Sequence, residues 1–163
     1  MSVRYAKVDD AEAIVKINVE AWKVSYKGLI ADSILDERKV DEKTILSIQQ
    51  KVLNQEAIVL VYEDKEVLGF LTAGSARDEI DIKNELRSIY VRPDAQHKGI
   101  GTKLLDRYKQ MMKGRRFYLY TLKNNAKSRG FYEKNGGIVC EEFNRSITID
   151  NELIEEVCYV FEP

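Results

Sequence analysis

The stretch Leu86-Arg-Ser-Ile-Tyr-Val-Arg-Pro-Asp-Ala-Gln-His-Lys-Gly-Ile-Gly-Thr-Lys-Leu-Leu105 decides the fold of this 163-residue chain. Its first part predicts a β-strand, because Ile89-Tyr-Val91 is β-branched and aromatic. Pro93 ends that strand, since proline has no backbone N–H to donate. Gly99-Ile-Gly101 then opens a helix with apolar residues at helical spacing. A strand, a glycine-containing turn and a helix N-terminus together predict an anion site, because the first amides of a helix have no partner within it.

Two common phosphate-binding motifs do not fit this turn. A Walker loop has Gly-Lys-Ser/Thr after its second glycine, whereas here Gly101-Thr-Lys103 has the opposite order. A Rossmann fingerprint needs a third glycine where this chain has Leu104. The pattern that remains is Gln96-His-Lys-Gly99-Ile-Gly101, which reads Q/R-x-x-G-x-G/A.

With its strand and helix, this pattern resembles the coenzyme A pyrophosphate loop of the GCN5-related N-acetyltransferases, the GNAT family. A second stretch, Asn125 to Gly136, is similar to the family's other motif, N-x-x-A/S-x-x-F-Y-x-x-x-G. Ser128 holds its small-residue position, and Phe131-Tyr132 is its aromatic pair. The resemblance covers residues 57–140 well and the N-terminal helices loosely. It departs at Gly137, where the family usually has an aromatic residue.

Composition limits the class of protein. Apolar residues make up 44% of the chain and charged residues 33%, as in soluble globular proteins. The net charge of −1 gives no basic field for nucleic acid. No apolar run of ~18 residues could span a membrane, and the N-terminus lacks a signal core, so we expect a cytoplasmic protein.

Cysteine and histidine usage excludes several kinds of site. Cys140 and Cys158 are predicted to be small buried residues and not a disulfide. With His97 as the only histidine and no cysteine–histidine cluster, the sequence predicts neither a histidine-based triad nor a bound metal.

The remaining sequence predicts a mixed β-sheet flanked by helices, in a single domain of the α/β (α+β) class covering residues 1–163. The resemblance implies the acyl-CoA N-acyltransferase fold. A capping box is expected at Asp9–Glu12, and glycines 69 and 74 are expected to mark bulges or close approaches. The two strand–helix–strand segments after Glu85 are expected to place parallel strands side by side. The predicted strands are residues 3–8, 57–62, 67–76, 85–91, 116–122, 138–149 and 152–161, and the helices 13–25, 30–35, 40–53, 99–113 and 126–135.

The chemistry of acetyl transfer to an amine sets three requirements. An alkyl ammonium has a pKa of ~10.4, so about one part in a thousand is free amine at pH 7 and a base must take its proton. The thioester carbonyl must be polarised as it becomes tetrahedral. The departing thiolate must be protonated or stabilised.

The resemblance implies a residue for each requirement. Tyr132 is the expected acid, although a buried aromatic residue explains it too. Glu85 is the expected base or water-orienting carboxylate, with a solvated charge at a strand end as the alternative. The amide of Val91 is the expected oxyanion donor, and the loop from Gln96 would hold the pyrophosphate mainly by its backbone. Asn125 could reach the pantetheine arm, cap its helix, or do both.

The expected co-substrate is acetyl-CoA. The residues expected to contact it are Ile89, Tyr90, Val91, Gln96, His97, Lys98, Gly99, Ile100, Gly101, Thr102, Asn125, Ser128 and Tyr132.

The acceptor is expected to be a small-molecule amine. Trp22 and Tyr26 are one helical turn apart and could form an aromatic wall, with Glu85 nearby in the site. Acidic residues in the first helices and before the central strand favour a cationic amine such as a polyamine; they are Asp32, Asp36, Glu37, Asp78, Glu79 and Asp81.

Three alternatives stay open at this point. The acceptor could be a protein N-terminus or an antibiotic-like amine. The chain could instead be a non-catalytic acyl-CoA-binding module, although such a module needs neither Glu85 nor Tyr132. A homodimer is also open.

Overall fold

The computed structural model describes residues 1–163 and divides them into two units. The first unit comprises residues 1–74 and 88–111, and the second comprises residues 75–87 and 112–163. Strand β4 (Asn84–Val91) contributes its end to the first unit and its beginning to the second. Each unit has its own hydrophobic core.

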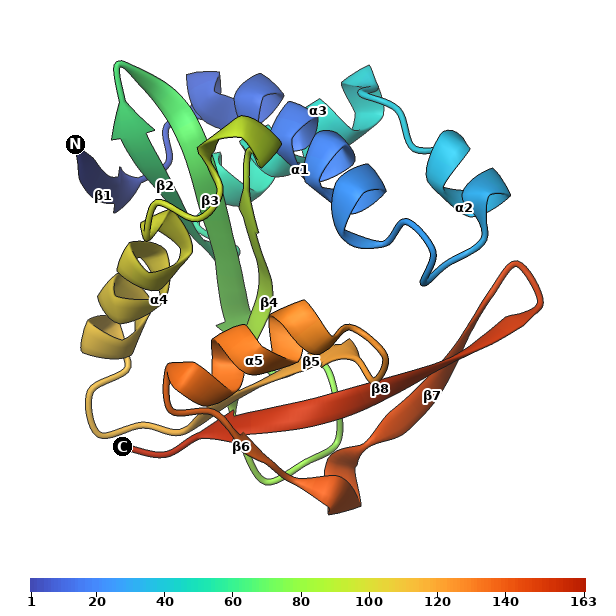
Figure 1. The fold of residues 1–163 in the computed structure, drawn as a ribbon. Coiled ribbons are helices and arrows are strands. Elements are labelled where there is room, and N and C mark those ends of the chain that lie inside the picture. Colours follow the sequence, from blue (N-terminus) through green and yellow to red (C-terminus); the bar gives the residue numbers. More distant parts are fainter. The chain divides into compact units, whose positions relative to one another are not determined.

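The first unit has antiparallel strands β1, β2 and β3 in that order, with β4 beside β3. Helices α1 and α3 bury Ile14, Ile17 and their neighbours against Val59, Val61 and Phe70. Figure 1 shows the unit in blue, green and yellow-green. Its elements are β1 (Ser2–Tyr5), a 3-10 turn (Val8–Asp10), α1 (Ala11–Ser25), α2 (Asp32–Asp36), α3 (Glu42–Leu53), β2 (Ile58–Asp64), β3 (Glu66–Ser75), a second 3-10 turn (Pro93–Ala95) and α4 (Ile100–Met111).

Helix α4 packs on β3 at Gly69, on the opposite face of the sheet from Phe70, because successive strand residues point to opposite faces. A Cβ atom at Gly69 would lie 3.1 Å from Ile100 Cγ2 and 3.1 Å from the carbonyl oxygen of Tyr90. Only glycine leaves room for this contact. The close approach predicted at Gly69 is therefore confirmed.

In the second unit, β4 pairs in parallel with β5, and Glu85 lies opposite Tyr118. Strand β8 is antiparallel to β5 on one side and to β6 and β7 on the other. The β7–β8 hairpin appears in orange and red in Figure 1. The core contains Ile82, Tyr118, Cys158 and Val160. The elements are β5 (Phe117–Leu122), α5 (Ala126–Lys134), β6 (Ile138–Val139), a 3-10 turn (Glu141–Phe143), β7 (Arg145–Ile149) and β8 (Glu152–Phe161).

The predicted sheet flanked by helices, the parallel β4–β5 pair and the closing hairpin are confirmed. The second predicted parallel neighbour is wrong, because β8 lies between β5 and β6. All of β5 pairs with the second part of β8, from Phe117 opposite Phe161 to Leu122 opposite Glu156. Because β5 occupies one edge of β8, β6 pairs with the opposite edge. The single strand predicted at residues 138–149 is also wrong, since the 3-10 turn divides it into β6 and β7.

The N-terminal prediction needs a further correction. The strand predicted at residues 3–8 ends at Tyr5, and the Asp9–Glu12 capping box is not formed. Instead the Asp10 carboxylate accepts the Lys7 backbone N–H at 2.7 Å and pairs with the Arg4 guanidinium at 2.7 Å. Although burial acts to raise it, the pKa of Asp10 is lowered by these partners. None of the helices combines the length and hydrophobicity of a transmembrane span.

Gly137 stands where an aromatic residue was expected, and its surroundings explain the difference. A Cβ atom there would lie 3.0 Å from Phe161 Cζ and 3.0 Å from the carbonyl oxygen of Tyr132. The Phe161 ring stacks on Phe117, with 4.7 Å between the ring centroids. The aromatic ring beside this backbone is thus supplied by β8.

We predict that Gly137→Ala lowers the free energy of unfolding by about 1–3 kcal/mol, because the new methyl group meets a fixed carbonyl and a packed ring. Gly130→Ala is the matched control in the same unit. Gly130 is exposed within α5 and a Cβ there meets nothing within 4 Å, so alanine should stabilise the helix by about 1 kcal/mol. Urea denaturation of both variants measures the difference, and equal stabilities would contradict the packing at Gly137.

Candidate active site

The turn before α4 presents backbone amides that the helix does not use. The first hydrogen bond of α4 runs from Lys103 N to Gly99 O at 3.1 Å, so the N–H groups from Gly99 to Thr102 have no partner within the helix. Gly99 has a φ of +77°, which favours glycine, and a Cβ there would meet nothing within 4 Å. The helix dipole adds partial positive charge at this end. The turn therefore suits an anion with phosphate geometry.

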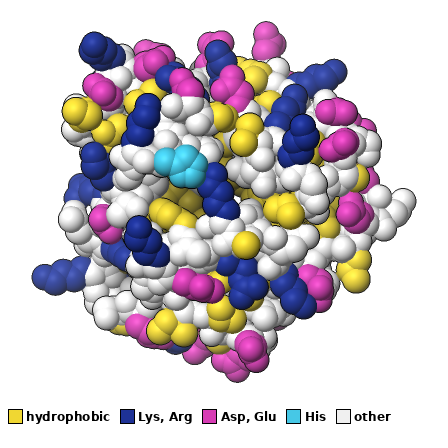
Figure 2. All heavy atoms as spheres, in the orientation of Figure 1, with side chains coloured by type: hydrophobic (Ala, Val, Ile, Leu, Met, Phe, Trp, Pro, Cys, Tyr) yellow, Lys and Arg dark blue, Asp and Glu magenta, His cyan; other side chains and the backbone are white.

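Side chains hold this turn in place. The Gln96 side-chain amide donates to the carbonyl of Val91 at 3.1 Å, which ties the turn to the end of β4. Lys98 Nζ donates to the carbonyl of Asp94 at 3.2 Å. His97 has a φ of +62° and is exposed; histidine is the cyan side chain in Figure 2, with Lys and Arg nearby on that face. Gln96 and Lys98 therefore help to hold the turn in the conformation that presents its backbone amides.

Trp22 and Tyr26 lie beside the end of β4 within the first unit. The Tyr26 and Tyr90 hydroxyls share a hydrogen bond at 3.0 Å. The rings of Trp22 and Tyr26 meet edge to face, with 4.5 Å between their centroids. The structure thus brings Trp22, Tyr26 and Tyr90 together, as an aromatic wall requires.

Arg38 covers one face of that wall. Its guanidinium carbon lies 3.5 Å from the centroid of the Trp22 ring, and Nη1 donates to Asn18 Oδ1 at 3.4 Å. Burial lowers the pKa of Arg38, and the hydroxyls of Tyr90 and Tyr26 are the groups that act against this shift. No carboxylate forms an ion pair with Arg38. The sequence did not indicate Arg38 as a site residue, because only the fold brings it next to Trp22.

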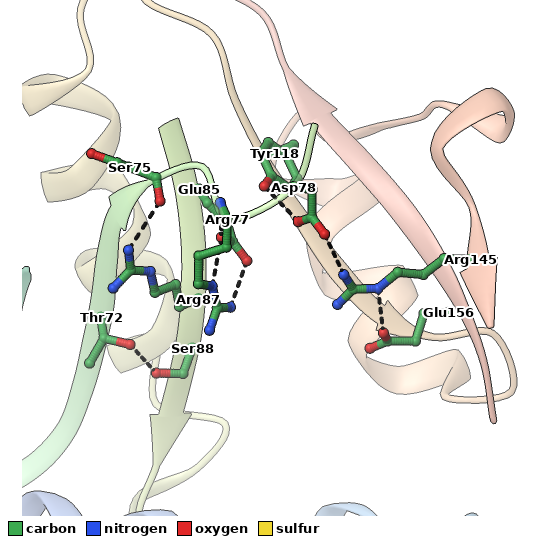
Figure 3. Close-up of polar contacts among 10 residues, drawn as sticks. All are labelled: Thr72, Ser75, Arg77, Asp78, Glu85, Arg87, Ser88, Tyr118, Arg145 and Glu156. Carbon is green, nitrogen blue, oxygen red and sulfur yellow. Dashed lines mark hydrogen bonds and ion pairs between the residues drawn. The ribbon is translucent and has the colours of Figure 1, made fainter. Parts of the chain in front are cut away.

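Glu85 is buried in the second unit, with 3% of its side chain exposed. Arg77 Nε donates to Glu85 Oε2 at 2.9 Å and Arg77 Nη2 donates to Oε1 at 2.7 Å, as Figure 3 shows. The backbone N–H of Arg77 adds a bond of 3.3 Å to Oε2. This burial excludes the alternative that Glu85 is a solvated charge at a strand end.

Asp78, the residue after Arg77, belongs to a second cluster of polar contacts. The Asp78 carboxylate accepts a hydrogen bond from the Tyr118 hydroxyl at 2.8 Å and pairs with Arg145 at 2.8 Å. Arg145 also pairs with Glu156 at 2.9 Å and stacks over the Tyr120 ring at 3.7 Å. Figure 3 shows the chain of contacts from Tyr118 to Glu156. Burial and the hydrogen bond with Asp78 raise the pKa of Tyr118.

Helix α5 carries the second motif. Asn125 is buried, and its side-chain oxygen accepts the Ser128 backbone N–H at 3.1 Å, so it caps the helix as expected. Tyr132 is 8% exposed, and its ring centroid lies 5.2 Å from that of Phe131 and 6.0 Å from that of Tyr159. Asn125 and Tyr132 are therefore buried, whereas Ser128 and Phe131 are half-buried.

The predicted site residues are divided between the units. The first unit holds Trp22, Tyr26 and residues 89–102, and the second holds Glu85, Asn125, Ser128 and Tyr132. A cavity of ≈390 Å³ in the second unit is lined by none of them, and its charged lining residues, among them Lys123, Arg129 and Glu155, carry both signs. Sequence reasoning missed Arg77, Arg145 and Arg38, which pair or stack with distant residues.

Known proteins resemble this chain over most of its length. The model of the Acetyltransferase (GNAT) family matches residues 17–137. Spermidine N(1)-acetyltransferase of Thermoplasma acidophilum is 26% identical over 144 residues, which cover 83% of this chain and 87% of that protein. The L-amino acid N-acyltransferase MnaT of Escherichia coli is 29% identical over 109 residues, covering 66% of this chain and 60% of that protein.

The fold agrees with these relatives. The crystal structure of PaiA N-acetyltransferase from Thermoplasma acidophilum in complex with coenzyme A has a TM-score of 0.76 at 24% identity, and covers 99% of this chain and 98% of that chain. The family match includes both the turn before α4 and the motif on α5. The chain belongs to the acetyltransferase (GNAT) family, and it is an N-acetyltransferase with acetyl-CoA as its co-substrate.

Proposed function

We propose that this protein transfers an acetyl group from acetyl-CoA directly to the nitrogen of a primary amine, with both substrates bound together. The observation that carries the proposal is the buried Glu85 carboxylate with its guanidinium partner. Burying an ion pair costs desolvation energy and seldom adds stability over an apolar pair of similar volume. A binding module would gain nothing from this arrangement, whereas an amine acetyltransferase needs a base.

Backbone groups of the first unit are proposed to hold the coenzyme. The free amides from Gly99 to Thr102 would bind the pyrophosphate, as their position at the start of α4 favours. The amide of Val91 would donate to the thioester oxygen as negative charge develops on it. Asn125 and Ser128 are proposed to face the pantetheine arm in addition to forming the helix cap.

Glu85 and Tyr132 are proposed to move the protons. Glu85 takes one proton from the ammonium, directly or through a water, and the neutral amine attacks the thioester carbon. The carbon–sulfur bond breaks as the carbonyl reforms, and Tyr132 donates its phenol proton to the departing thiolate. The second proton lost by the nitrogen restores Tyr132, so that one proton is released to solvent from Glu85 in each turnover.

A polyamine or other small cationic amine is the acceptor that we propose. The similarity to a spermidine N(1)-acetyltransferase supports it, and Asp32, Asp36 and Glu37 are exposed on and beside α2. Asp78 and Asp81 contribute less than the sequence suggests, because Arg145 and Arg116 neutralise them.

An amino acid is a second candidate acceptor, and Arg38 is the observation that favours it. A half-buried guanidinium without a carboxylate partner repels a polycation and attracts a carboxylate. The similarity to an L-amino acid N-acyltransferase agrees with this reading.

Gly101→Asp tests the turn. It should weaken coenzyme A binding about ten-fold or more, because a negative charge would face the pyrophosphate at the start of α4. Gln110→Asp adds the same charge at the exposed far end of α4 and should leave affinity nearly unchanged. Calorimetry with coenzyme A measures both, and equal losses would show that the turn does not hold the phosphates.

Arg38→Gln separates the two acceptors. If a polyamine is the acceptor, removal of the repelling charge should raise kcat/KM for spermidine, and added salt should reduce the preference for polyamines over neutral amines. If an amino acid is the acceptor, kcat/KM for that amino acid should fall. Thiol release from acetyl-CoA over a set of amines gives the readout, and a wild-type preference for acidic amino acids would overturn the polyamine proposal.

Tyr132→Phe tests the proposed acid. The ring and its packing remain and the proton donor is lost, so kcat should fall ~10²–10⁴-fold while coenzyme A affinity changes little. A pH–rate profile with the identified amine provides the measurement. Near-wild-type kcat across the profile would make Tyr132 a packing residue, with a water protonating the thiolate.

A further inference from the structure

We infer that Arg77 is a positioning residue for Glu85: it fixes the orientation of this carboxylate and turns one of its oxygens towards the proton of the acceptor amine. The inference rests on the proposed role of Glu85 as the base. Arg77 itself is 59% exposed and would not touch the reacting atoms.

The geometry leaves the two oxygens of Glu85 unequal. Oε2 accepts two bonds, from Arg77 Nε at 2.9 Å and from the Arg77 backbone N at 3.3 Å. Oε1 accepts one bond, from Arg77 Nη2 at 2.7 Å. Since each carboxylate oxygen has two lone pairs, Oε1 keeps one for a water or an ammonium. Arg77 thus assigns the base function to Oε1.

Electrostatics require a cation at this place. Burying a lone carboxylate costs desolvation energy, so a side chain as buried as Glu85 calls for a cationic partner. The titratable and charged groups that interact with Glu85 are Arg77 from the loop before β4, Tyr118 from β5 and Cys158 from β8, and Asp78 interacts with Arg77 beside it. Burial raises the pKa of the Cys158 thiol to about 12, and the pKa of Tyr118 is raised as well, so both are neutral near pH 7. Arg77 supplies the positive charge.

The loop that carries Arg77 is fastened on both sides. The Ala76 N–H donates to the Lys83 carbonyl at 2.9 Å and closes the loop. Asp78, the next residue after Arg77, is held by Tyr118 and Arg145. Burial acts to lower the pKa of Arg145, but its hydrogen bond with Glu156 raises it, so the anchor stays charged. Figure 3 shows both the clamp on Glu85 and this anchor. The loop therefore delivers the guanidinium to one fixed position.

The test compares Arg77→Gln, Arg77→Lys, Glu85→Gln and the double variant Arg77→Gln/Glu85→Gln in a pH–rate assay of acetyl-CoA thiol release. Arg77→Gln should lower kcat about 10–100-fold at neutral pH with the KM for acetyl-CoA unchanged. The acid limb of its pH–rate profile should move to higher pH, because a carboxylate without a neighbouring cation binds a proton more readily than one that has such a neighbour. Arg77→Lys keeps the positive charge but replaces the guanidinium's several donors with a single ammonium group. Its kcat and its pH profile should therefore lie between those of the wild type and Arg77→Gln.

The matched control is Arg116→Gln. Arg116 forms exposed pairs with Asp81 at 3.5 Å and with Glu162 at 3.1 Å, so the substitution removes the same charge without touching Arg77 or Glu85. Its kcat and pH profile should stay close to those of the wild type. Thermal melting and coenzyme A affinity of every variant separate a folding defect from a positioning defect. If Arg77→Gln does not fold, the profile of Arg77→Lys decides.

The double variant decides whether Arg77 acts through Glu85. If it does, the double variant should be no slower than Glu85→Gln alone. Multiplied losses, or a wild-type pH profile in Arg77→Gln, would overturn the positioning role and leave Glu85 as the base. Wild-type kcat in Glu85→Gln would instead overturn the base assignment, and the role of Arg77 with it.

Discussion

The contact between α4 and Gly69 is the constraint on which the turn before α4, in the first unit, depends. It places the first turn of α4 against β3 and beside the carbonyl of Tyr90, near the end of β4. The chain must then pass from Val91 to Ile100 over a short path. It does so with a 3-10 turn at Pro93–Ala95 and with positive φ angles at His97 and Gly99. The amides at the start of α4 have no partner within the helix, and this path leaves them beside the end of β4.

Local features could be predicted well from the sequence. The glycines before α4, the Asn125 cap and the central strand each depend on residues close together in the chain. Pro93 and Gly99 set backbone conformation by themselves, so no tertiary information was needed. The parallel partner of β4 followed from the strand–helix–strand order.

Long-range features could not be predicted. The hydrophobic pattern marks β6 and β8 as strands but does not show that β8 lies between β5 and β6. The Arg145–Asp78 pair joins residues 67 positions apart. The role of Arg77 as the partner of Glu85 could be recognised only once the structure showed that Glu85 is buried. The sequence suggested that Asp78 and Asp81 would favour a cationic amine, whereas Arg145 and Arg116 neutralise these two carboxylates.

The position of β8 also governs how the second unit forms during synthesis. Strand β8 is the last strand in chain order, yet it is the sole hydrogen-bonding partner of β6 and β7 and the antiparallel partner of β5. Until residues 152–161 have emerged from the ribosome, β5 has one unpaired edge and β6 and β7 have no sheet to join. Unpaired strand edges invite association with other chains. A nascent chain arrested before β8 is therefore more prone to aggregate than the finished protein. The open strand edges of the second unit become paired in a single late step, when β8 is added.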